Sequence, residues 1–194
     1  MNGTMIIYML GWVMNLEAAF MLLPCLTALI YRESAGFSFL IVAFALLIAG
    51  VLCTFRKPAN KAFYAREGFA VVALSWILLS VTGALPFVIS GEIPHFIDAM
   101  FETVSGFTTT GSSILTDVEA LSRCMLFWRS FTHWIGGMGV LVFMLAIVPM
   151  AGGQSIHLLR AESPGPQVEK LVPKVQSTAK ILYGIYILLT ILEI

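Results

Sequence analysis

One apolar stretch constrains this sequence more than any other feature: residues 37–55 contain no charged side chain. An α-helix rises about 1.5 Å per residue and the hydrocarbon core of a bilayer is about 30 Å thick, so a spanning helix needs about 20 apolar residues. Three other mostly apolar stretches are at least as long, at residues 5–31, 69–89 and 125–150. The sequence therefore predicts an all-α integral membrane protein.

The composition excludes several classes of function. Of the 194 residues, 59% are hydrophobic and 11% are charged, whereas soluble domains are about 45–50% apolar and about 25% charged. The formal net charge is zero, so no overall field attracts a polyanion. The three cysteines lack the spacing of a disulfide framework or a zinc site. We expect a chain that lies in a lipid bilayer, binds no nucleic acid, needs no cofactor and is not an enzyme.

The distribution of lysine and arginine predicts how the helices are oriented, because loops on the cytoplasmic side carry an excess of these residues. With alternating spans, one side receives only Arg32 and Arg123. The other side receives Arg56, Lys57, Lys61, Arg66, Arg160, Lys170, Lys174 and Lys180. The second side is therefore expected to be cytoplasmic.

A short segment between two spans fits neither a span nor a simple loop. Residues 94–107 begin with proline and place apolar side chains at helical spacing, which predicts an amphipathic helix too short to cross a bilayer. Its apolar residues are Phe96, Ile97, Met100, Phe101 and Val104. A run of threonine, glycine and serine follows at residues 108–113. By the orientation above, this segment enters the membrane from the outer side.

Two interpretations of residues 108–113 are open. Such composition is usual for a solvated external loop. A solvated loop, however, has no need of the apolar helix before it, and that helix favours a cation filter. A dehydrated potassium ion needs a ring of backbone carbonyl oxygens, and Gly111 tolerates the positive φ that can align them. A helix that ends near Gly106 also points its negative dipole end inwards.

Acidic and basic side chains inside the spans are further candidates, because intramembrane charges are commonly functional. Glu17 is interpreted as a packing or snorkelling residue, with ion handling as the alternative. Arg129 and His133 lie four residues apart on one helix face. They predict a structural network with Glu102, with a proton relay as the alternative. Three glycines at 136, 137 and 139 predict close helix packing, which is commoner, or a gating bend.

Several motifs together resemble Trk-type potassium uptake proteins of the TrkH/TrkG family. The central one is Phe101-Glu102-x-x-Ser105-Gly106-Phe107-Thr108-Thr109-Thr110-Gly111. Downstream stand Phe127-Trp128-Arg129 and Trp134-x-Gly136-Gly137-Met138-Gly139. Arg66-Glu67-Gly68-Phe69, Gly83-Ala84-Leu85-Pro86-Phe87 and Arg160-Ala161-Glu162-x-Pro164-Gly165-Pro166 fit the same order.

The resemblance implies a potassium-channel-like fold with two leading helices and four helix–pore-loop–helix repeats. The potassium filter residues would be Thr109, Thr110, Gly111 and Ser112, supported by Thr108, Glu102 and Arg129. Ser112 stands where family members often have alanine. Three of the four filter quarters are absent, so we expect the chain to be the front piece of a longer protein that contributes one quarter of the pore.

The expected organisation has five parts. In chain order they are two leading transmembrane helices (1–56), a basic cytoplasmic linker (57–65), the first helix–pore helix–filter–helix repeat (66–153), a cytoplasmic linker (154–179) and the start of the next repeat (180–194).

The resemblance further implies potassium uptake across the bacterial cytoplasmic membrane, by passive conduction or by symport with another cation. It implies a homodimer and a peripheral nucleotide-binding regulatory subunit on the cytoplasmic face. Two alternatives are open: a proton-coupled secondary transporter that uses Glu17, Arg129 and His133, and an accessory membrane subunit without its own pore. A membrane enzyme is disfavoured because no nucleophile–base pair is visible.

Overall fold

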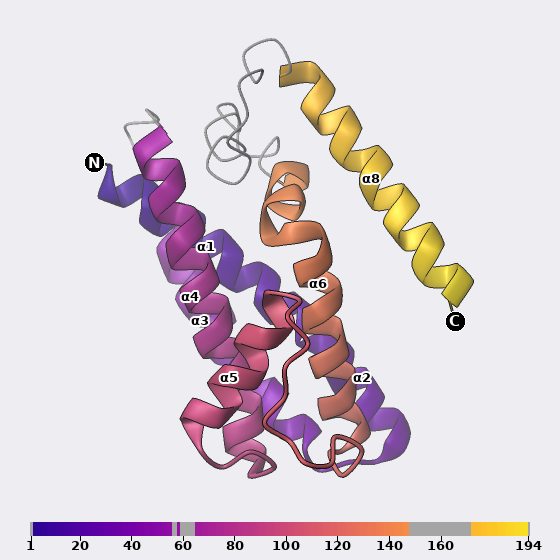
Figure 1. Cartoon of the computed structure of the whole chain (residues 1–194). Helices are drawn as coiled ribbons and strands as arrows, with labels where there is room; N and C mark the ends of the chain where they lie inside the picture. The colour runs from indigo at the N-terminus through magenta and orange to yellow at the C-terminus, as the bar shows by residue number, and fades with distance from the viewer. Residues whose placement is uncertain (1, 56–57, 59–64, 148–171, 194) are drawn as a thin grey trace.

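The computed structural model describes residues 2–55, 58, 65–147 and 172–193, and within these ranges the secondary structure is entirely helical. The helices are α1 (Gly3–Phe20), α2 (Leu22–Tyr31), α3 (Gly36–Phe55), α4 (Ala65–Ser90), α5 (Phe96–Phe107), α6 (Arg123–Ile147) and α8 (Val172–Glu193), as Figure 1 shows. The predicted all-α class is confirmed. Half of the basic residues that predict the orientation lie outside the described residues, namely Arg56, Lys57, Lys61, Arg160 and Lys170.

The first predicted span is a broken helix. It consists of α1 and α2, which meet at Met21 with φ −65° and ψ −14°. Pro24 accounts for the break, because it has no N–H to donate to Phe20 and its ring crowds that carbonyl. Among the residues that the structure describes, three segments are long and apolar enough to cross a membrane: Gly3–Tyr31, Gly36–Phe55 and Glu67–Ser90.

The two leading helices approach each other through glycine. A Cβ atom on Gly50 of α3 would lie 2.8 Å from the carbonyl oxygen of Gly11 on α1. In the reverse direction, a Cβ atom on Gly11 would lie 3.0 Å from the carbonyl oxygen of Gly50. Small residues allow this approach, and in lipid the resulting van der Waals contact is a main source of helix association.

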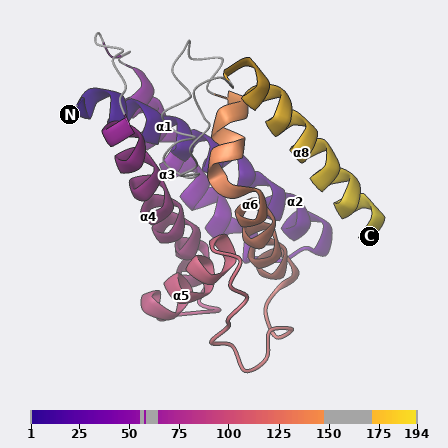
Figure 2. The same ribbon diagram turned by 45° about the horizontal axis from the view of Figure 1, so that its top comes forward.

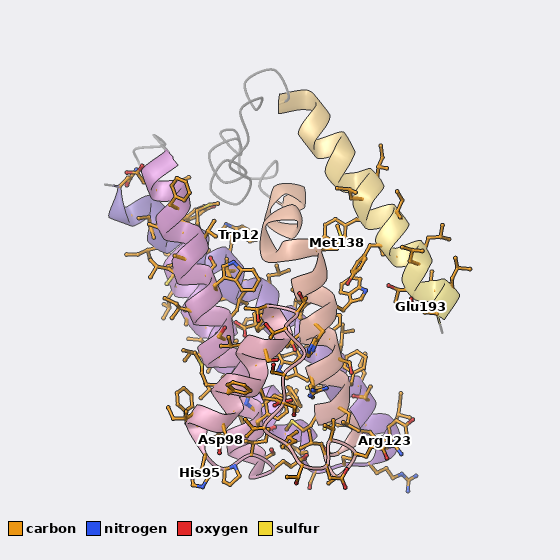
Figure 3. All side chains as sticks on the ribbon, in the orientation of Figure 1. Trp12, His95, Asp98, Arg123, Met138 and Glu193 are labelled. Carbon is orange, nitrogen blue, oxygen red and sulfur yellow. The ribbon has the colours of Figure 1, made fainter. Side chains whose placement is uncertain are left out.

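The short helix α5 lies between α4 and α6 (Figures 1 and 2). It begins near one end of the bundle and ends at mid-height, and residues 108–122 return to the end where α6 begins. His95, Asp98 and Arg123 lie at this shared end (Figure 3). The helix begins at Phe96, not Pro94, because Pro94 belongs to the turn that follows Gly91 at φ +80°.

Part of the apolar face of α5 does not pack on this chain, although Met100 packs against the buried core. Phe96, Ile97 and Phe101 are 41%, 75% and 46% exposed. The buried face instead carries small and polar residues, namely Ala99, Glu102, Thr103, Ser105 and Gly106, together with Phe107. Small residues at a helix–helix interface allow close approach, which is the usual arrangement in membranes.

The fourth predicted span, residues 125–150, is not a continuous helix. Its described part, α6, has a non-helical backbone at Gly139, with φ 68° and ψ 133°. Glycine adopts this positive φ without steric cost. Gly139 thus marks a bend in α6, as one of the two interpretations of these glycines proposed, and a part for this bend in gating stays a prediction.

The last described helix starts earlier than expected. We predicted it to begin near Lys180, but α8 begins at Val172. The polar residues before Lys180 lower the local hydropathy without preventing a helix, which explains the error. α8 packs on α6, where Trp134 Nε1 donates to Thr190 Oγ1 at 3.0 Å and the Tyr186 hydroxyl donates to the Trp134 carbonyl at 3.1 Å. Gly137 faces the Tyr186 hydroxyl, so its predicted packing role is confirmed.

Candidate functional site

The site begins where α5 ends in the middle of the bundle. The Thr109 N–H donates to the Gly106 carbonyl at 3.0 Å, and the Thr110 N–H donates to the Ser105 carbonyl at 3.0 Å. This pair of bonds is a Schellman motif, which ends a helix on a left-handed residue. That residue is Thr109, with φ 56°. The chain therefore turns sharply out of α5 directly into the predicted filter residues.

Two left-handed residues alternate with ordinary ones along this loop. Gly111 has φ 73°, as the glycine suggested, and Thr109 has φ 56°. A β-branched residue at positive φ is an outlier, since its side chain crowds the backbone. The left-handed conformation of Thr109, a predicted filter residue, was not expected, because threonine carries no sequence signal for it. Strained backbone of this kind clusters at functional sites.

The predicted filter residues face away from the rest of this chain. Residues 108–114 are all exposed. A Cβ atom on Gly111 would meet nothing within 4 Å. The requirement for glycine at this position therefore comes from the backbone angle and not from lack of space.

A buried carboxylate holds the loop from behind. Glu102 on α5 is 2% exposed. Its carboxylate accepts hydrogen bonds from Ser113 Oγ at 2.9 and 3.0 Å, from the Ile114 N–H at 3.2 Å and from Arg129 Nε at 2.6 Å. The predicted contact between Glu102 and Arg129 is thus present. Sequence analysis missed Ser113 and Ile114, because no periodic spacing connects a returning loop to the helix before it.

Three donors make this buried charge tolerable. Removing a carboxylate from water costs several kcal/mol unless a counter-charge and further hydrogen bonds replace the lost hydration. Arg129 supplies the counter-charge, with its side chain 19% exposed, and the loop supplies the other two donors. The arrangement joins α5, the returning loop and α6 at one point.

Glycines let α5 sit close to both neighbouring helices. A Cβ atom on Gly136 of α6 would clash with the Phe107 carbonyl, and one on Gly106 would clash with Thr132 Oγ1. The predicted packing role of Gly136 is therefore confirmed. On the other side, a Cβ atom on Gly83 of α4 would lie 3.0 Å from the Thr103 side chain of α5. The Gly83 carbonyl also accepts a hydrogen bond from Nε1 of the buried Trp128 on α6 at 3.0 Å.

Two glutamates from remote turns cap the start of α6. Glu33 accepts from the N–H groups of Arg123 at 2.8 Å and Cys124 at 2.9 Å, and Glu92 accepts from the Ser122 N–H at 2.9 Å and hydroxyl at 2.6 Å. Burial acts to raise the pKa of Glu33, but the two backbone hydrogen bonds outweigh it and the pKa lies below its usual range. The α2–α3 and α4–α5 turns are thereby tied to the loop that leaves the site.

The three residues of the proton-relay alternative are not connected by direct hydrogen bonds. His133 Nδ1 lies 2.9 Å from the Arg129 carbonyl of its own helix, and the Arg129 side chain pairs with Glu102. The Glu17 carboxyl contacts the Thr82 hydroxyl. In the part of the chain that the structure describes, no group of three His, Cys, Asp or Glu side chains could hold a metal ion.

The sequence and the fold are both similar to known transporters. A family model described as "TrkH: Cation transport protein" matches residues 35–194. The Trk system potassium uptake protein TrkH of Vibrio parahaemolyticus is 40% identical over 190 residues, which cover 96% of this chain and 39% of that protein. The Trk system potassium uptake protein TrkG of Escherichia coli K12 is 39% identical over 188 residues, which cover 95% of this chain and 39% of that protein.

The crystal structure of the potassium transporter TrkH from Vibrio parahaemolyticus matches with a TM-score of 0.77 and 36% sequence identity, covering 98% of this chain and 38% of that one. This chain therefore spans less than half the length of the relatives it matches. The family is one of cation transporters and not of enzymes, in agreement with the apolar helices of a multi-pass membrane protein. The chain belongs to the TrkH family of cation transport proteins.

Proposed function

We propose that residues 109–112 form one quarter of a potassium-selective path, in which Thr109, Thr110, Gly111 and Ser112 present backbone carbonyls to the ion. The observation that carries this proposal is the pair of left-handed residues, Thr109 and Gly111, in an exposed loop at the end of a half-length helix. Alternation between positive and negative φ rotates successive peptide planes, which can bring their oxygens to one side.

The chemistry needs four such loops. A dehydrated potassium ion requires a ring of oxygens, and one loop supplies only part of each ring. The similarity to proteins named as potassium uptake proteins, more than twice as long as this chain, supports a pore completed by further sequence. This chain alone then contributes one quarter and does not conduct selectively.

Glu102, Arg129 and Thr108 act as supports in this proposal. The Glu102 carboxylate accepts hydrogen bonds from Ser113 and Ile114 of the returning loop, so it fixes the distance between that loop and α5. The Thr108 hydroxyl lies 2.7 Å from the Thr110 hydroxyl and links these two residues of the loop. These groups keep the carbonyls in place without contacting the ion.

The proposal includes the cellular setting. The excess of lysine and arginine on one side of the predicted spans supports a bacterial cytoplasmic membrane protein whose filter loop opens to the outside. The family resemblance supports a homodimer with a nucleotide-binding regulatory subunit on the cytoplasmic face. Transport then proceeds by conduction through the filter or by symport with a second cation.

The test replaces one glycine and compares it with a matched control. Gly111→Ser in the full-length protein places a side chain on a backbone at φ 73°, and we expect loss of the preference for rubidium over sodium in cellular uptake. Gly91→Ser imposes the same kind of strain at φ 80° in a turn with equal space around it. Gly91→Ser should keep wild-type selectivity. Wild-type uptake ratios in Gly111→Ser would refute the assignment.

A further inference from the structure

A second buried acid lies in α1, outside the proposed ion path. Glu17 is 1% exposed. Both of its carboxyl oxygens lie 2.7 Å from Thr82 Oγ1 on α4. Within the described ranges no basic side chain forms an ion pair with it. The question is how an acid in this position is stabilised.

The oxygen atoms around Thr82 identify the protonation state. Thr82 Oγ1 lies 2.6 Å from the Leu78 carbonyl as well as 2.7 Å from the Glu17 carboxyl. Both are hydrogen-bond distances between oxygen atoms, so each contact requires a hydrogen. A hydroxyl has one hydrogen, and a carbonyl has none. Contacts of 2.6 and 2.7 Å are both too short for one shared hydrogen to serve well, which assigns a second hydrogen to Glu17.

We infer that Glu17 is a neutral carboxylic acid that donates its O–H to Thr82 Oγ1, while Thr82 donates to the Leu78 carbonyl. The side chains around the Glu17 carboxyl agree with this protonation state. Glu17 borders a cavity of about 20 Å³ whose other lining residues are apolar: Val13, Leu16, Phe20, Leu79, Phe107, Trp128 and Ile135. A water molecule needs two to four polar partners, which these side chains do not offer. An unpaired carboxylate in such surroundings is costly, whereas a hydrogen-bonded acid is not.

The position of this bond gives Glu17 a role as a positioning residue. Thr82 precedes Gly83, whose carbonyl accepts the Trp128 N–H. A Cβ atom on Gly83 would lie 3.0 Å from Thr103 and 3.3 Å from Phe107, so the end of α5 rests on this part of α4. Glu17 therefore ties the leading helix to the segment that seats α5 directly before the loop. Its proton is structural and is not exchanged during transport.

The protonation state can be measured without any transport assay. The full-length protein in lipid is compared by infrared spectroscopy with Glu17→Gln and Thr82→Val, at mildly alkaline pH where an ordinary glutamate is ionised. We expect a protonated-carboxyl stretching band that is lost in Glu17→Gln and shifted in Thr82→Val, because the O–H loses its acceptor. A spectrum in which Glu17→Gln removes only a carboxylate band, or no band, would overturn the inference.

A second arm tests the positioning role and rests on the proposed function. Glutamine keeps an N–H donor for Thr82, so Glu17→Gln should keep uptake within about twofold of wild type and leave its pH profile unchanged. Glu17→Leu removes the donor and should lower the melting temperature, and this loss should not occur in Glu17→Gln. A large fall in uptake or an altered pH profile in Glu17→Gln would show that the proton takes part in transport. The infrared result holds in either case, so the two failures are distinguishable.

Discussion

The bond between Glu102 and Arg129 makes a prediction about coupled stability. Replacing Glu102 by glutamine keeps the shape but leaves the Arg129 guanidinium without its counter-charge. Breaking a buried pair from one side typically costs about 3–5 kcal/mol. Because the Arg129 side chain retains 19% exposure, water offsets part of the loss, and we expect about 3 kcal/mol for Glu102→Gln.

Arg129→Gln perturbs the same bond from the other side. The carboxylate then keeps the Ser113 hydroxyl and the Ile114 N–H but loses its charged partner. We expect a cost of about 3 kcal/mol again. The double variant places two neutral amides face to face, which can bond each other. Its cost should be about 3–4 kcal/mol, so the coupling energy is about 2–3 kcal/mol.

The assay is unfolding of the purified full-length protein in detergent, combined with potassium uptake by cells that lack other uptake systems. Arg123→Gln is the control, because Arg123 lies on the same helix but is exposed; we expect a change within about 0.5 kcal/mol. Each single variant should also reduce uptake, because the ion pair no longer holds the returning loop in place. Strict additivity of the two single changes would refute a direct bond that supports the loop.

Two further predictions concern packing and pH. Gly136→Ala puts a methyl group against the Phe107 carbonyl and should destabilise the protein by about 1–3 kcal/mol in thermal unfolding. Gly184→Ala is the control, because its methyl group would meet nothing within 4 Å, and it should not destabilise the protein. Glu33 has a pKa below its ordinary value of 4.5 in the folded state, so the stability it contributes is fully present above that pH and is lost as the pH falls through the folded-state pKa. Glu33→Gln should therefore flatten the acid limb of the stability curve, and an unchanged limb would show that the caps on α6 do not matter.

The helices of the leading pair could be predicted because hydropathy is a local property of the sequence. The span at 37–55 needs only its own apolar residues to be recognised, and α3 covers the same residues. The bend at Gly139 and the early start of α8 at Val172 could not be predicted in this way. The bend lies inside an apolar stretch, where hydropathy does not change, and the start of α8 lies among polar residues, where hydropathy does not mark the helix.

The supports of the site were predictable in part for a similar reason. Glu102 lies about two helical turns from the start of α5, and Arg129 lies about two turns from the start of α6. Both helices start at the same end of the bundle, so regular helix geometry brings the two side chains to the same depth. Ser113 and Ile114 lie on an irregular return path, whose course depends on tertiary contacts. The left-handed backbone of Thr109 is imposed by the Schellman motif against the preference of its own side chain. Irregular backbone at the centre of the site is thus the part that local sequence describes least.

The two buried acids show two ways of removing a net charge from a membrane protein. Glu102 has an arginine within reach and forms an ion pair with it, which ties α5 to α6 behind the loop. Glu17 has only the Thr82 hydroxyl, and in our inference it keeps its proton. In both cases the acid is neutralised behind the loop. In the proposed path, which uncharged carbonyls line, backbone dipoles attract the cation. Glu17→Gln should therefore leave ion preference unchanged, whereas changes at Gly111 should alter it.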